Sequence, residues 1–135
     1  MELELIHQNQ LATVEYDAEN QIGWFTIVGL VNIELAVEAF EAYLKVLDQK
    51  PLRGAIFNCM NMKGTFTKLN PWINENWYPA IIPQGYTCWS LATTDAFSKF
   101  AGNMLINKLT PKEVTAKIFN SLEKSQEWVY EMVEK

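Results

Sequence analysis

Histidine, cysteine and arginine are scarce in this sequence of 135 residues. His7 is the single histidine, so a Ser-His or Cys-His nucleophile pair would depend on it, and we expect a surface residue instead. Cys59 and Cys88 form no Cys-x-x-Cys motif, and with one histidine they fall short of the roughly four ligands of a structural zinc site. We therefore expect no metal, no cofactor, no catalytic residue set and two buried free thiols.

Bases are outnumbered by acids, 11 against 16, which gives a formal net charge of −5. Arg53 is the only arginine, whereas nucleic-acid-binding surfaces favour clustered arginine and lysine, so no nucleic-acid partner is expected. The charge is uneven, because residues 1–48 hold nine acids and one base while residues 49–135 hold seven acids and ten bases. The stretch 50–68 has four bases and no acid, which fits either a solvated face or a loop that attracts anions.

Long apolar runs and low-complexity segments are also missing. No stretch approaches the ~18 apolar residues of a membrane span, and the acidic, alternating start differs from a secretory signal. Glycine and proline number six and five, too few for a fibrous or disordered chain. With 49% hydrophobic residues and five Trp, five Tyr and seven Phe, the sequence predicts one compact cytoplasmic domain over residues 1–135, without an integral membrane segment.

The first third of the sequence alternates apolar and polar residues. Residues 2–7, 11–16 and 22–28 are predicted as strands joined by short polar turns, which favours an antiparallel meander. From residue 33 the apolar residues recur with a helical period, so a helix is predicted with Asn32 as its N-cap and Lys50–Pro51 as its end.

Short apolar runs then alternate with helical patterns. Strands are predicted at 53–59 and 86–93, separated by a loop at 60–69 and a helix that Asn70 caps and Pro79 ends. Asp95 is predicted to cap a further helix, whose apolar face holds Phe97, Phe100, Ala101, Met104 and Leu105.

The last quarter leaves one choice open. Residues 111–119 fit either a helix or a turn before a short strand at 115–119, and Asn120 or Ser121 caps the final helix. The order of elements predicts an α/β fold: a mixed sheet, antiparallel in its N-terminal strands and parallel in its later ones, flanked by about four helices.

Three motifs carry a family resemblance. A Trp-x-x-x-x-Trp-x-Pro pattern spans 72–79, Gly85 precedes the strand after it, and the end reads Phe119-x-Ser121-x-Glu123-x-Ser125-x-x-Trp128. With these motifs, residues from about 20 to 130 resemble the SpoIIAA-like proteins of the STAS superfamily, whose fold is similar to the lipid-binding domain of Sec14-type proteins. The resemblance implies a bacterial α/β regulatory or binding module, although Ser125 stands where members often carry alanine.

The phosphorylation switch of that superfamily does not carry over to this chain. Anti-sigma-factor antagonists hold a phosphorylatable serine in an Asp-Ser-Ser-Gly-like loop after a central strand. The matching stretch here, residues 58–65, contains neither aspartate nor serine. Thr65 and Thr67 are the nearby hydroxyls, and threonine in a loop usually serves as a turn or cap residue.

Ligands of open α/β sheets bind beyond the carboxyl ends of the parallel strands, which here are 58–59 and 92–94. The segment after the first end combines amides, hydroxyls, two lysines and an aromatic ring beside a helix N-terminus. This set fits an anion site, and an ordinary polar loop is the alternative. Trp72 and Trp77 diverge by roughly 140° on a helix, so one is expected in the core and the other nearer the surface, at a pocket or dimer interface. The candidate binding residues are Asn58, Asn61, Lys63, Thr65, Thr67 and Trp72.

Three functions are compatible with these observations. The first is a non-catalytic regulatory or protein-interaction module that binds a protein partner or a small apolar or anionic ligand through residues 59–72, as a monomer or homodimer. The second is a carrier of a small apolar ligand or lipid, of the Sec14 kind. The third is an enzyme of unknown reaction, for which no paired catalytic groups stand out, because most acids fall on solvated helix faces.

Overall fold

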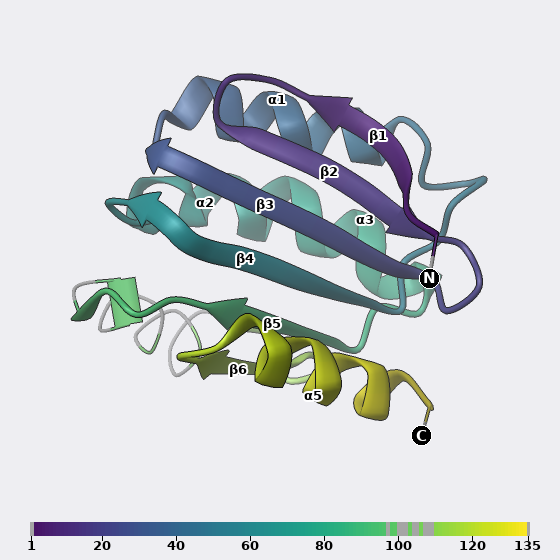
Figure 1. Ribbon diagram of the computed structural model, residues 1–135. Helices are drawn as coiled ribbons and strands as arrows, with labels where there is room; N and C mark the ends of the chain where they lie inside the picture. The colour runs from purple at the N-terminus through teal and green to yellow at the C-terminus, as the bar shows by residue number, and fades with distance from the viewer. Residues whose placement is uncertain (1, 97, 100–102, 104–105, 107–109, 135) are drawn as a thin grey trace.

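A single mixed sheet of six strands forms the centre of the fold in this computed structural model, which describes residues 2–96, 98–99, 103, 106 and 110–134 (Figure 1). The strands lie in chain order, antiparallel from β1 to β3 and parallel from β3 to β6. The predicted fold class is therefore confirmed. The strands are β1 (Glu4–Gln8), β2 (Ala12–Asp17), β3 (Ile22–Leu30), β4 (Gly54–Lys63), β5 (Cys88–Ala92) and β6 (Thr115–Phe119).

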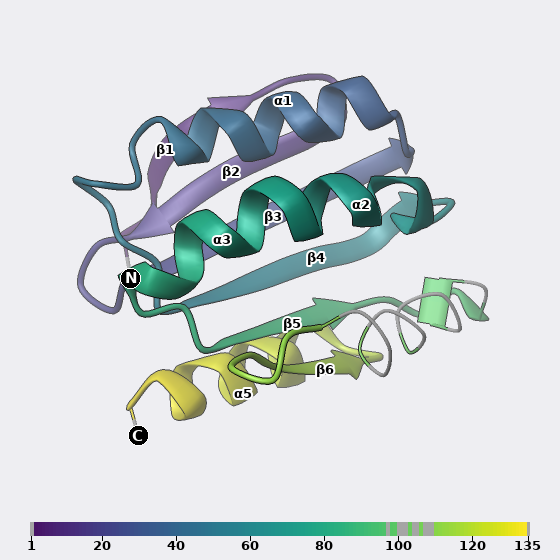
Figure 2. The same ribbon diagram turned by 180° about the vertical axis from the view of Figure 1, so that it is seen from behind.

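Helices cover the two faces of this sheet unequally. Helix α1 (Ile33–Leu44) and a segment containing α2 (Asn70–Trp72) and α3 (Tyr78–Ile81) lie on one face, while α5 (Leu122–Glu134) lies on the other (Figures 1 and 2). The first face carries the larger core. The second carries a small one, and α5 contacts β4, β5 and β6, so none of the described helices lies over β1 and β2 on that side in Figure 1.

The helix expected between Asn70 and Pro79 is longer than the sequence predicted. It begins with a 3₁₀ turn at Thr67–Leu69 and continues through α2, α3 and a second 3₁₀ turn at Ile82–Gln84, to end at Gly85 with φ of 105°. Asn70 makes no capping bond, so its predicted capping role is wrong. Pro79 does not end the helix, because a π-helical turn at Ile73–Trp77 precedes it and the Tyr78 N–H bonds Ile73 O, five residues back.

Side-chain capping bonds form at three of the positions where the sequence predicts them. Asn32 accepts a hydrogen bond from the Leu35 N–H, Asp95 from the Ser98 N–H, and Ser121 from the Lys124 N–H. Residues 111–114 form a turn before strand β6, which decides between the two readings of that segment. The described residues contain three long helical segments against about four predicted, and the apolar face expected at Phe97, Phe100, Ala101, Met104 and Leu105 lies outside them.

Strand β4 runs four residues further than predicted and contains a β-bulge. Thr26 pairs with Asn58 and Val28 pairs with Asn61, so one residue of β3 faces two of β4. The extra residue reverses the alternation, which places Met62 in the larger core and leaves Lys63 exposed. The part of the predicted loop from 60 to 63 is therefore strand.

Candidate functional site

The six candidate binding residues fall into two separate groups. Asn58, Asn61 and Lys63 lie on β4, on the side opposite the buried Met62, while the other three follow Gly64 and lead into the helical segment. Asn58 is half-buried, and its side-chain oxygen accepts the Met60 N–H at 3.3 Å, which satisfies a donor freed by the bulge. Asn58 thus shapes the strand, whereas Asn61 and Lys63 are exposed.

The other three candidates, Thr65, Thr67 and Trp72, form hydrogen bonds or ring contacts within the fold. The two threonine hydroxyls hydrogen bond each other at 3.0 Å, and the Thr67 N–H donates to Thr65 Oγ1 at 3.4 Å. The half-buried Trp72 ring lies 5.9 Å from that of Phe40 on α1. Trp77 is 2% exposed, so it lies in the core while Trp72 lies nearer the surface, as their spacing predicts. These three candidates build the start of the helical segment rather than a shared site with Lys63.

Exposed apolar side chains accompany Asn61 and Lys63 at the end of the sheet. Val28 pairs with Asn61 and Leu30 pairs with Lys63, and the exposed fractions are 43% for Val28 and 75% for Leu30. Gly29 between them has φ of 77°, a backbone conformation that suits glycine. We call Val28, Leu30, Asn61 and Lys63 the strand-end patch. It offers two apolar groups, one amide and one positive charge.

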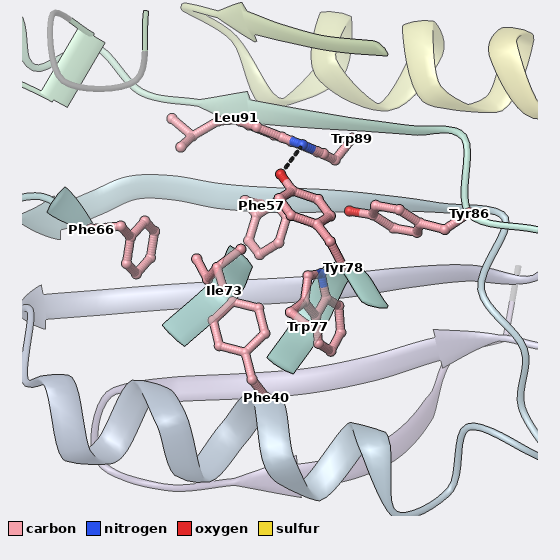
Figure 3. A pocket seen from close by; sticks show the side chains of 9 residues that line it. All are labelled: Phe40, Phe57, Phe66, Ile73, Trp77, Tyr78, Tyr86, Trp89 and Leu91. Carbon is pink, nitrogen blue, oxygen red and sulfur yellow. Dashed lines mark hydrogen bonds between the residues drawn. The ribbon is translucent and has the colours of Figure 1, made fainter. Parts of the chain in front are cut away.

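A pocket lies between the sheet and the helical segment (Figure 3). Its inner space has a volume of about 30 Å³, and its total empty volume is about 360 Å³ when the open mouth is counted. None of the described residues that line it is charged. These residues are Phe40, Phe57, Phe66, Ile73, Trp77, Tyr78, Tyr86, Trp89 and Leu91.

Two of the lining residues are tyrosines, Tyr78 and Tyr86, and their hydroxyls differ in hydrogen bonding. The Trp89 indole N–H donates to the Tyr78 hydroxyl at 3.1 Å, and Thr110 also bonds Tyr78. Tyr86 is 2% exposed, and its hydroxyl has no hydrogen-bond partner of normal geometry among the described residues. Burial raises the pKa of Tyr86 well above its ordinary value, Tyr78 and Cys88 raise it further, and the Trp77 indole lowers it.

The thiols and the histidine are placed as the sequence predicts. Cys59 and Cys88 are free and buried, and burial raises the pKa of Cys59 and, against lowering by Thr87 and Arg53, that of Cys88 to about 11. His7 lies at the surface, where its Nε2 is 2.9 Å from Glu38 Oε1. Across the described ranges, no three His, Cys, Asp or Glu side chains gather as metal ligands.

Comparisons with known proteins show a fold relationship. No protein-family profile matches the chain, and no curated protein matches it. Among solved structures, it is similar to an uncharacterized protein of the DUF3478 family with a SpoIIAA-like fold from Shewanella loihica PV-4. The TM-score is 0.54 at 14% identity, covering 95% of this chain and 92% of that one. The chain therefore has the SpoIIAA-like fold that its aromatic motifs indicate. Of the helices described, none has the length and apolar character needed to cross a membrane.

Proposed function

We propose that this chain is a non-catalytic interaction module of the STAS-like kind, and that a protein partner binds at the strand-end patch. The observation that carries this proposal is the pairing of Leu30, 75% exposed, with the exposed Lys63. Single exposed leucines are ordinary on protein surfaces, but here a second apolar residue, Val28, lies on the same strand two positions away. Apolar groups bordered by polar ones are typical of interface centres.

The patch predicts the chemistry of the partner surface. Val28 and Leu30 fit an apolar side chain, and the charge of Lys63 favours a carboxylate beside it. Lys68, five residues after Lys63, is a further exposed base, whereas Lys50 pairs with Glu4 and Arg53 donates to Val133 O near the opposite end of β4. We therefore expect an apolar side chain flanked by aspartate or glutamate on the partner. A small anionic ligand at Lys63 is the alternative occupant.

The experiment is an affinity capture from the organism of origin with three variants of the full chain. Leu30→Asp removes the apolar group and adds a repulsive charge toward an acidic partner, and Lys63→Glu reverses the charge of the patch. Leu5→Asp is the matched control, since Leu5 is 57% exposed on β1, the edge strand at the other side of the sheet from β4. Circular dichroism confirms that each variant is folded.

The proposal expects one captured protein that Leu5→Asp retains and that Leu30→Asp and Lys63→Glu each weaken by about tenfold or more, as hot-spot changes do. Its affinity falls with added salt, because Lys63 is exposed. Capture that ignores Leu30→Asp, or that Leu5→Asp disrupts equally, contradicts the proposal.

A second candidate, a carrier of a small apolar ligand, is favoured by the aromatic pocket. The inner space of about 30 Å³ holds one or two water molecules and excludes an acyl chain in this conformation. A carrier of a lipid or of another organic ligand would therefore require the pocket to open.

A further inference from the structure

An open groove lies between the helical segment and the turn that precedes β6, and it is separate from the aromatic pocket. Its inner space is about 320 Å³, and its empty volume is about 560 Å³ when the open mouth is counted. Sites for small molecules start at about this size. The turn contributes Pro111 and Glu113, and the helical segment contributes Asn74, Tyr78, Pro79, Ile82 and Pro83. We call these seven residues the proline groove.

The apolar part of the proline groove is rigid. Three of its lining residues are prolines, whose rings lose almost no conformational entropy when a ligand binds against them. The ring of Tyr78 is fixed as well, because Tyr78 is 4% exposed and its hydroxyl bonds Trp89 and Thr110. The groove therefore offers a preformed apolar surface to the body of a ligand.

The π turn leaves a backbone acceptor at this groove. In an α-helix the Asn74 carbonyl would accept the Tyr78 N–H, but that N–H bonds Ile73 O instead. The next residue, Pro79, has no N–H to supply. A helix carbonyl points toward the turn that follows it, where Tyr78 and Pro79 line the groove. The Asn74 carbonyl thus lacks both of these helical donors, and π turns of this kind are frequent at functional sites.

The side-chain polar groups of the groove are acceptors too. The Nδ2 of Asn74 donates to Asn70 O at 3.0 Å, which leaves its side-chain oxygen for another molecule. Glu113 is exposed and forms no ion pair with the described residues, and its basic neighbour in the sequence, Lys112, does not line the groove. An ammonium group has three donors and no acceptor, so it matches this set in both hydrogen bonding and charge.

We propose that the proline groove binds a small organic cation, a primary ammonium group on an apolar body the size of an aromatic ring. The ammonium group donates to the Asn74 oxygens and pairs with the Glu113 carboxylate, while the proline rings and Ile82 contact the body. The groove shares no residue with the strand-end patch, so this site does not depend on the proposed protein partner.

The experiment compares two probes of nearly equal shape, 2-phenylethylamine, which is an ammonium ion at neutral pH, and 2-phenylethanol, which is uncharged. Binding to the full chain is measured by NMR titration of the backbone amide signals, which also locates each probe. Glu113→Gln removes the charge of the groove. Glu75→Gln is the matched control, since Glu75 is an exposed residue of the helical segment that does not line the groove. Circular dichroism confirms that both variants are folded.

We expect the wild-type protein and Glu75→Gln to bind the amine about fivefold more tightly than the alcohol, the upper range for an exposed ion pair. Glu113→Gln should bind the two probes within about twofold of each other. The shifted signals should gather at residues 74–83 and 111–114. Equal affinities of the two probes for the wild-type protein would overturn the cationic class, and an equal loss in Glu75→Gln would overturn the role of Glu113. Titrations that shift no signal of the groove would overturn the site.

Discussion

The hydroxyl of Tyr130 on α5 donates a hydrogen bond of 2.7 Å to Oδ2 of Asp17, a residue 113 positions earlier in the chain. Asp17 is 3% exposed and also accepts bonds from the Asn20 side chain and from the N–H groups of Glu19 and Asn20. The Trp24 indole N–H reaches the same Tyr130 hydroxyl at 3.3 Å. This network joins the C-terminal helix to the turn between β2 and β3. It adds hydrogen bonds to the apolar contacts of the small core under α5, to which Trp24 belongs.

The first prediction concerns acid unfolding. Burial raises the pKa of Asp17, but the bonds from Asn20, Tyr130 and the two backbone N–H groups outweigh it and hold the pKa below its usual 3.8. A depressed folded pKa contributes stability that is present above pH ~4 and is lost as pH falls through the folded pKa. Tyr130→Phe should therefore lower the unfolding free energy at pH 7 by about 1.5–3 kcal/mol, the range for a bond to a charged group. The deficit should shrink toward pH 2.

Urea unfolding at pH 7 and at pH 2–3 measures this difference. Tyr16→Phe serves as the comparison, since its hydroxyl bonds a backbone carbonyl and no carboxylate. A Tyr130→Phe deficit that stays the same at both pH values would mean that the bond to Asp17 does not depend on the charge of that group.

The second prediction concerns the contact of α5 with β5. The hydroxyls of Ser90 and Ser125 hydrogen bond each other, and both residues are fully buried. Ser125→Ala leaves the Ser90 hydroxyl without this partner and should cost about 1–3 kcal/mol. The double variant Ser90→Ala with Ser125→Ala removes both polar groups and should recover part of that loss. Chemical denaturation of the four proteins gives the cycle, and strictly additive losses would show that the pair is not coupled.

The third prediction separates the two pocket tyrosines by stability in the absence of ligand. Tyr78→Phe breaks the bond from Trp89 and should lower the unfolding free energy by about 1–2 kcal/mol. The Tyr86 hydroxyl has no bond of normal geometry among the described residues and only a weak one with the Trp77 indole, so Tyr86→Phe should cost less than Tyr78→Phe. Thermal and urea unfolding check both variants. A loss at Tyr86 as large as that at Tyr78 would show that the Tyr86 hydroxyl is bonded in solution.

The fourth prediction concerns the thiols. Because burial raises the pKa of Cys59 and holds that of Cys88 at about 11, few thiolates exist at pH 8 and neither sulfur is accessible. Ellman's reagent should label no cysteine in the native protein and two in guanidinium. Rapid labelling of one thiol without denaturant would show that the sheet opens locally at that strand.

The sequence predicts the elements whose signals are local. The caps at Asn32 and Ser121 and the period of the helix after residue 32 depend on neighbours within a turn, and both are found as expected. The change from antiparallel to parallel pairing is also found as predicted, because strands that alternate with helices favour parallel neighbours.

The sequence does not predict features that depend on pairing between distant segments. The bulge that turns Lys63 outward is set by the register of β4 against β3, and Gly64 rather than residue 60 ends the strand. Likewise, the helical segment passes Pro79 through a π turn that no local pattern in the sequence signals. The burial of Tyr86 among aromatic side chains also follows only from what surrounds it in the fold.

Photo-crosslinking at the strand-end patch tests the proposed interaction most directly. The variants Leu30→p-benzoylphenylalanine and Leu5→p-benzoylphenylalanine place the same reactive group at two exposed leucines of one sheet. Irradiation in living cells of the organism of origin should give one discrete adduct from position 30 and none from position 5, and Lys63→Glu in the same chain should abolish it. Adducts from both positions, or none from position 30, would contradict binding at this patch.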